Sequence, residues 1–247
     1  MSSSEGLAGA NLGFYALITI PAFHCLIMHG KFGLVGWVYV LAMCGLRIIG
    51  NGMSLHAYEN HEVSTVATII NGIGLSPLLI ASLGFLHEAN HSILHALPSY
   101  LKTWASLFAH VVIGSGIGLA AASKGHESFL RAGLIIFAIG WSMVCALVGL
   151  SYTNSAHRQR LADERKILLG ITIALPMIGI RIIYAIATAF STCGLEGGSL
   201  AVRVIFGTLP EFLTMLVYLG AGIATRNLAR SRLEPAMQKD QSVDITV

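Results

Sequence analysis

Long apolar stretches, separated by short polar segments, run along most of the 247-residue chain. A membrane-spanning helix needs roughly 20 mostly apolar residues. Seven windows approach or exceed that length: 12–28, 33–53, 63–86, 101–122, 132–152, 167–190 and 201–224. We therefore predict an all-α integral membrane protein, folded as a single bundle of seven transmembrane helices.

The composition supports a multi-pass membrane protein. Hydrophobic residues make up 55% of the chain and charged residues 11%, whereas a soluble domain has about 25% charged residues. Residues 1–11 are mostly polar and include Glu5 but no basic region, so we expect a first helix that is not cleaved as a signal peptide. The four cysteines are dispersed and suggest neither a disulfide framework nor a metal site.

Lysine and arginine concentrate on one side of the predicted bundle, and this asymmetry sets the orientation. With the N-terminus outside, the cytosolic side receives Lys31, Lys102, Arg158, Arg160, Arg165, Lys166, Arg226, Arg230, Arg232 and Lys239. The outer side receives Lys124, Arg131 and Arg203. We predict an N-out/C-in orientation, with residues 1–225 as the transmembrane domain and residues 226–247 as a mobile cytosolic tail.

A few polar residues lie inside the apolar windows, where a charge costs at least ~2.5 kcal/mol. With a rise of about 1.5 Å per residue, Arg47 and Arg181 lie ~20 Å above the inner edge. Glu211 lies ~15 Å and Asn71 ~12 Å below the outer edge. All four are therefore expected in the outer half of the membrane, close enough to interact.

This cluster has two interpretations. An arginine–glutamate pair between helices can simply fix packing, but two cations against one acid leave a surplus charge that suits a ligand or reaction site. Tyr184 lies one turn after Arg181 and would share its face. If both arginines contact Glu211, the carboxyl stays ionised and serves as a base or counter-ion. The proton donor would then be His24, Tyr184 or Glu59.

Other polar groups have simpler explanations. The stretch HAYENHE (56–62) at the outer mouth is expected to be a solvated loop, or alternatively a lid or proton-transfer site. His24 and His110 are lone histidines, expected to be hydrogen-bonded in the interior. The stretch GSGIGLAAAS (114–123) suits close helix packing.

The stretch HEANH (87–91) matches the zinc pattern H-E-x-x-H. On a helix, His87 and His91 would share a face and Glu88 could act as a base. No other predicted helix offers an evident acidic partner at that depth. We therefore predict no metal site.

Four stretches carry a resemblance: GLRIIGNG (45–52), INGIGLSPLLIASLGFL (70–86), ERKILLGITIALPMIGIRIIYAI (164–186) and PEFLTMLVYLGAGIA (210–224). Over most of its length the chain resembles a family of small fungal seven-span membrane proteins, much of which has no assigned function. In class it is similar to the membrane-bound terpene cyclases of the ascochlorin, ascofuranone and macrophorin type. Those proteins cyclise a prenyl chain, often one with a terminal epoxide, by protonation. The Asn-x-x-Trp-Glu element of the indole diterpene cyclases is absent from this chain.

The resemblance and the polar cluster together favour a membrane terpene cyclase of fungal secondary metabolism. Its expected catalytic residues are Glu211, Arg47, Arg181, Asn71, Tyr184, His24 and Glu59. The expected partners are a lipophilic small-molecule substrate and membrane lipids, with no cofactor and no nucleic acid, in the endoplasmic reticulum membrane. A seven-span receptor or small-solute transporter binding an acidic ligand is the alternative, and a membrane epoxide hydrolase is a third possibility. The sequence leaves the oligomeric state open.

Overall fold

The computed structural model describes residues 3–60, 70, 75–93, 103–122, 127–153, 160–191 and 199–228. Within these residues all regular structure is helical. The elements are α1 (Ser3–Glu59), α3 (Leu75–Ala89), η1 (His91–Ile93), α4 (Thr103–Ala121), α5 (Glu127–Thr153), α6 (Ala162–Phe190), α7 (Leu200–Val202), η4 (Arg203–Thr208) and α8 (Leu209–Ala224). The η1 turn is a 3-10 helix and η4 is a π-helix.

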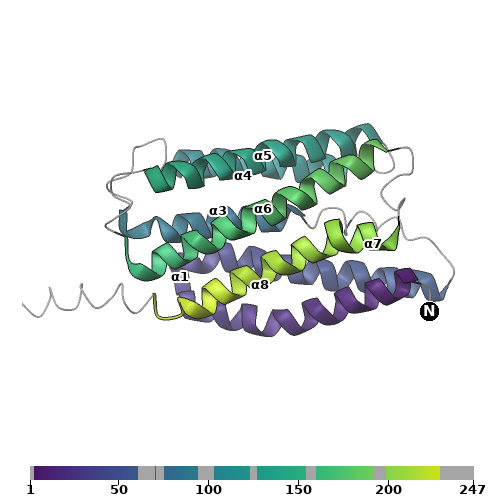
Figure 1. Ribbon diagram of the computed structural model, residues 1–247, viewed down its shortest axis with the longest axis horizontal. Helices are drawn as coiled ribbons and strands as arrows, with labels where there is room; N and C mark the ends of the chain where they lie inside the picture. Colours follow the sequence, from purple (N-terminus) through teal and green to yellow (C-terminus); the bar gives the residue numbers. More distant parts are fainter. Residues whose placement is uncertain are drawn as a thin grey trace, which may run out of the picture.

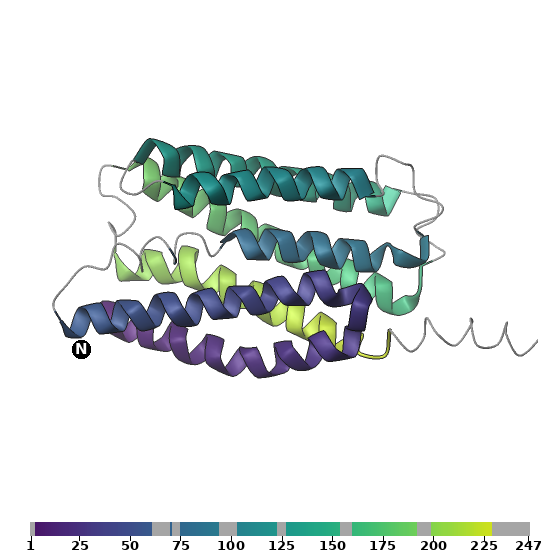
Figure 2. The same cartoon turned by 180° about the vertical axis from the view of Figure 1, so that it is seen from behind.

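A sharp kink at Gly30 divides α1 into two arms, 3–29 and 31–59. Gly30 has φ 58° and ψ −148°, a backbone conformation that is open essentially to glycine alone. Figure 2 shows the two arms side by side, joined at the kink. Each arm is longer than the roughly 20 residues that cross a membrane, and the two arms contain the first two predicted windows.

The helices form a bundle in which α3 and α6 lie between two outer groups (Figure 1). On one side α4 packs against α5, and on the other α8 and the two arms of α1 lie together. The α6 helix contacts both α5 and α8, while α3 contacts α1 and α6. The middle helices therefore join the two outer groups into one bundle.

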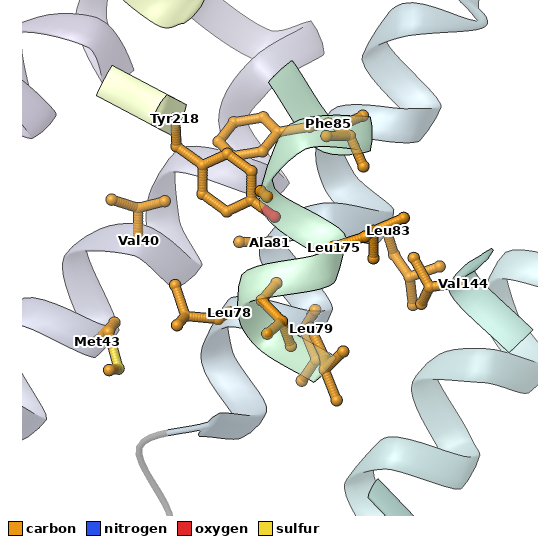
Figure 3. Close-up of a cluster of buried hydrophobic side chains, with 14 of the residues drawn as sticks. Val40, Met43, Leu78, Leu79, Ala81, Leu83, Phe85, Val144, Leu175 and Tyr218 are labelled. Carbon is orange, nitrogen blue, oxygen red and sulfur yellow. The ribbon is translucent and has the colours of Figure 1, made fainter. Parts of the chain in front are cut away.

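The short α3 helix lies at the centre of the hydrophobic core. Every α3 side chain from Ser76 to Leu86 is buried, and a helix that is apolar on all sides belongs in an interior. Figure 3 shows side chains of α3 meeting others from α1, α5, α6 and α8: Val40, Met43, Leu78, Leu79, Ala81, Leu83, Phe85, Val144, Leu175 and Tyr218. Pro77 lies in the first turn of α3, where a proline costs no internal hydrogen bond.

Glycines set the closest helix crossings. A side chain at Gly84 of α3 would collide with the backbone of Gly36 in α1. In the small-residue run of α4, Gly116 lies directly against Gly133 of α5, so the expected packing role is confirmed at that position. Small residues are typical of helix contacts in membranes, because they let backbones approach.

The structure supports a multi-pass membrane protein. Within the described residues, four helical stretches are long and apolar enough to cross a bilayer: Glu5–Glu59, Ser128–Thr153, Ala162–Phe190 and Leu200–Ala224. The apolar part of α4, Ser106–Ala121, is shorter. Large apolar side chains cover the outward faces, among them Leu17, Ile20, Ile27, Phe108, Val111, Ile135, Ile139, Ile173, Ile183, Leu216 and Ile223. Soluble monomers rarely expose so much contiguous apolar surface.

Candidate functional site

Two separate clusters of buried titratable side chains flank α8. The first surrounds Glu211, in the first turn of α8. Glu211 Oε1 accepts a hydrogen bond from Arg47 Nε at 2.6 Å, and Arg47 Nη2 donates to Oε2. Tyr15 donates its hydroxyl to Oε1. This outer cluster therefore ties both arms of α1 to α8.

Arg181 joins the outer cluster less closely. Its Nε lies 3.7 Å from Glu211 Oε2, beyond hydrogen-bonding distance, and its guanidinium carbon lies 5.9 Å from the centre of the Tyr184 ring. Among the residues that the structure describes, Arg181 Nε has no hydrogen-bond partner. The structure thus brings together Arg47, Arg181 and Glu211, as the depth argument predicts, and places Tyr184 beside Arg181.

The local backbone explains the position of Glu211. Proline at position 210 has no N–H, and its ring would clash with the carbonyl four residues earlier in a regular helix. The wider turns of the η4 π-helix immediately before it relieve that clash. Gly207 in η4 lies close to the Tyr184 ring, so this stretch packs tightly against α6.

The remaining expected site residues lie elsewhere. His24 is exposed on the outward face of α1 beside Phe23, so the expectation of an interior histidine is wrong there. In the same helical segment Ala22 and Cys25 are buried, so these residues, and not His24, face the core. Glu59 is exposed at the end of α1. Asn71 lies outside the described residues.

The second cluster, which we call the inner pair, consists of His29 and Glu88. His29 Nδ1 lies 2.7 Å from Glu88 Oε1, and both side chains are 1% exposed. His29 Nε2 lies 3.0 Å from the Gly222 carbonyl oxygen. The inner pair therefore connects the Gly30 kink of α1, the C-terminal turn of α3 and the C-terminal part of α8.

The hydrogen-bond geometry fixes how many protons the inner pair holds. A carbonyl oxygen can only accept, so His29 Nε2 carries a hydrogen. The contact between His29 Nδ1 and Glu88 Oε1 needs one further proton, bound to either atom. Imidazolium with carboxylate and imidazole with carboxylic acid have the same total charge of zero. On this geometry one proton lies between His29 Nδ1 and Glu88 Oε1, and this is the proton that the pair could transfer.

A small cavity opens beside the inner pair, with room for about one water molecule. Its walls come from α1, α3, α6 and α8: His29, Trp37, Phe85, Glu88, Ile167, Ile171, Tyr218, Ala221 and Gly222. The Tyr218 hydroxyl is 2.5 Å from the Ser82 hydroxyl. The Tyr218 and Phe85 rings meet edge to face in the core, with centroids 4.9 Å apart (Figure 3). Three aromatic rings thus line a cavity that also contains an acid–base pair.

The indole of Trp37 adds a further polar group to this cavity. Trp37 is 1% exposed, and its Nε1–H has no hydrogen-bond partner among the described residues. Buried donors in native proteins are nearly always satisfied. A water or a ligand oxygen in the cavity could accept this hydrogen bond.

Sequence reasoning missed His29 and Tyr15 and gave Glu88 another role. His29 falls between two predicted windows, and Glu88 follows the third, so both look like solvated loop residues. The predicted topology nevertheless places both residues at the cytosolic ends of their helices. This shared position is the sequence signal that could have brought them together. In the HEANH pattern, His87 is exposed while Glu88 is buried against His29, so these two neighbours point to different environments.

A third buried polar network closes the same end of the bundle. Arg160 Nη2 donates to the side-chain Oδ1 of Asn90 and to the Ser151 hydroxyl, the latter at 2.5 Å. Glu164 accepts from the Ser92 N–H at 3.2 Å and from the Ser92 hydroxyl. Burial lowers the pKa of Arg160, and the Glu164 carboxylate partly offsets this shift. Arg160, expected in the basic cytosolic loop, therefore holds helices together from a buried position.

Comparison with known proteins places the chain in a family without giving it an activity. No curated protein matches it, and no solved structure does. One family model matches residues 1–228, which is nearly the whole described chain. The protein therefore belongs to the family described as Domain of unknown function (DUF7702).

Proposed function

We propose that this protein is an integral-membrane enzyme that cyclises a prenylated, lipophilic substrate by acid–base catalysis, as terpene cyclases of fungal secondary metabolism do. The observation that carries this proposal is the inner pair, a buried histidine–glutamate contact that lines an aromatic cavity. The substrate reaches the site through the lipid, because the bundle presents apolar side chains outward.

The proton of the inner pair starts the reaction in this proposal. It moves to the epoxide oxygen or the terminal alkene of the substrate, and the π electrons of the chain form the ring bonds. Proton loss leaves Glu88 as a carboxylate facing the new carbocation. A C–H proton of the cyclised cation then returns to the inner pair and forms the final double bond. The sequence of steps is an isomerisation, so it needs no cofactor and consumes no water.

The walls of the cavity suit a cationic intermediate. Aromatic faces stabilise positive charge by about 0.5–2 kcal/mol each, and Trp37, Phe85 and Tyr218 line the cavity. The Trp37 N–H has no hydrogen-bond partner among the described residues, so it provides a donor for an epoxide oxygen. The present cavity is smaller than a prenyl chain, so substrate binding widens the contact between α6 and α8. Gly170 and Ala221 form that contact.

Epoxide hydrolysis is the second candidate function, and the size of the cavity favours it. The space beside Glu88 holds about one water molecule. In such a site the proton of the inner pair moves to the epoxide oxygen while the water attacks an epoxide carbon, and the attacking water then returns a proton to the pair. The product would then be a diol rather than a ring.

The membrane topology forms part of the proposal. The two arms of α1 cross the bilayer separately, and α3 and α4 cross within the bundle, which gives seven spans. The N-terminus faces outward and the C-terminus faces the cytosol, as the distribution of lysine and arginine indicates. The endoplasmic reticulum membrane is proposed because the substrate is lipophilic.

A conversion assay tests the function. Yeast microsomes containing the wild-type protein, or none, receive an epoxidised farnesyl-aromatic substrate, and products are separated by chromatography and weighed by mass spectrometry. A new product of unchanged mass supports cyclisation. A product heavier by one water supports hydrolysis. Saturable binding of the substrate without any product contradicts both enzyme proposals and favours a receptor or transporter.

A further inference from the structure

The outer cluster carries one more positive charge than negative charge among its described side chains. Arg47 and Arg181 face the single carboxylate of Glu211, which Arg47 engages with two of its nitrogen atoms. Tyr15 uses the same carboxylate as its acceptor and brings no charge. An uncompensated cation inside a bilayer is costly, so intramembrane arginines mark ligand or ion sites.

The surplus charge belongs to Arg181. Arg47 is held by short hydrogen bonds, whereas Arg181 Nε remains 3.7 Å from Glu211 and has no hydrogen-bond partner within the described part of the chain. The Tyr184 ring beneath the guanidinium offers only weak compensation. The guanidinium therefore keeps donors for an oxyanion, which it binds best in a forked geometry.

Arg181 is also within reach of molecules dissolved in the lipid. Its side chain is 15% exposed, against 4% for Glu211. Beside it, the Tyr184 ring stacks against the ring of Phe206 in η4, with the ring centroids 6.5 Å apart, and Phe206 is exposed. The charge therefore lies at the seam between α6 and η4, next to a surface that suits an alkyl chain.

We propose that Arg181 binds the carboxylate of a lipophilic acid whose alkyl chain lies along the α6–η4 seam. The carboxylate neutralises the surplus charge of the outer cluster, and the chain covers Phe206. Glu211 and Gly222 are separated by three turns of α8, about 16 Å, so this site is distinct from the inner pair. It does not depend on the proposed function.

Equilibrium binding of radiolabelled palmitate tests the site. Purified protein is placed in phosphatidylcholine nanodiscs at alkaline pH, where the probe is ionised, and empty nanodiscs give the background. Wild type is expected to bind palmitate saturably and to bind hexadecanol at least about tenfold more weakly, because the alcohol lacks the charge. Equal binding of acid and alcohol, or no saturable binding above background, overturns the proposal.

Variants assign the binding to Arg181. Arg181→Gln is expected to weaken palmitate binding at least about tenfold and Arg181→Lys to weaken it less. Lys166→Gln, which removes an exposed cation of α6 that pairs with Asp163 far from the seam, is the matched control and should bind normally. Arg181→Gln removes an unneutralised charge, so its thermal unfolding midpoint should not fall. Normal palmitate binding by a folded Arg181→Gln protein overturns the assignment.

Discussion

Two of the buried carboxylates, Glu88 and Glu211, have different surroundings. Glu211 faces two arginines and a tyrosine. Glu88 lies 2.7 Å from His29 Nδ1 and lines an aromatic cavity. In the proposed function Glu88 donates the proton, whereas Glu211 serves as a counter-ion.

Loss of the Glu211 charge should destabilise the protein strongly. Glu211→Gln leaves Arg47 and Arg181 as neighbouring buried cations, and breaking a buried pair costs about 3–5 kcal/mol. Tyr15→Phe removes a single hydrogen bond and should cost about 1 kcal/mol. Unfolding of both variants in detergent, followed by circular dichroism, checks the order. Equal stability of Glu211→Gln and wild type would contradict the assignment of Glu211 as the counter-ion.

Substitutions at two tryptophans should distinguish a loss of activity from a loss of stability. The Trp37 N–H has no partner among the described residues, so Trp37→Phe should leave stability unchanged and lower kcat/KM about tenfold if it binds substrate. The Trp141 N–H donates to the Leu175 carbonyl oxygen at 2.9 Å. Trp141→Phe should therefore lose about 1 kcal/mol of stability and keep its kcat/KM. The reverse pattern would exclude Trp37 from the site.

At the level of helices, the path of α1 depends on one residue. Gly30 adopts a positive φ, and this kink places His29 at the inner end of the bundle beside Glu88. Any other L-residue would strain the backbone there. The kink therefore couples the fold of the first two helices to the geometry of the inner pair.

A glycine-to-alanine comparison tests this coupling. Gly30→Ala should destabilise the protein by about 1–3 kcal/mol, since its backbone conformation excludes a side chain. Gly45→Ala lies within a regular helix with open space at its Cβ, so it should be neutral or stabilising by up to about 1 kcal/mol. Thermal unfolding of the two variants measures the difference. A Gly30→Ala protein as stable as Gly45→Ala would show that the kink is not fixed by this residue.

Hydropathy predicts where the helices lie, because membrane helices must be long and apolar. Depth counting also brings Arg47, Arg181 and Glu211 together, since a helix has a fixed rise. The same reasoning could not find the inner pair, because His29 and Glu88 lie at helix ends where polar residues are ordinarily solvated. It also misplaced His24, because rotation about a helix axis decides whether a side chain faces lipid or core, and here Cys25 faces the core instead.

At the scale of the whole molecule, the bundle encloses polar groups at two depths and presents an apolar surface. The outer cluster, the inner pair and the Arg160 network each join three or more chain segments. Buried polar contacts of this kind fix one arrangement of helices that apolar packing alone would leave less specific.

The proposed topology predicts that the chain termini lie on opposite sides of the membrane. Glycosylation acceptor tags added to each end report this in microsomes, since only a lumenal tag receives a glycan. The N-terminal tag should be modified and the C-terminal tag should not. Seven crossings, an odd number, separate the two ends, and the proposed orientation places the N-terminus in the lumen. Modification of both tags, or of neither, would contradict the proposed topology.

The central claim is that Glu88, and not Glu211, supplies the proton for conversion of the substrate. The most direct test compares initial rates of Glu88→Gln, Glu211→Gln and Glu59→Gln in the microsome assay, each normalised to the amount of folded protein. Glu59 is exposed and controls for the chemical change itself. We expect Glu88→Gln to lower the rate at least about 100-fold, while folded Glu211→Gln and Glu59→Gln remain active. Full activity in Glu88→Gln, with activity lost in folded Glu211→Gln, would contradict it and move the chemistry to the outer cluster.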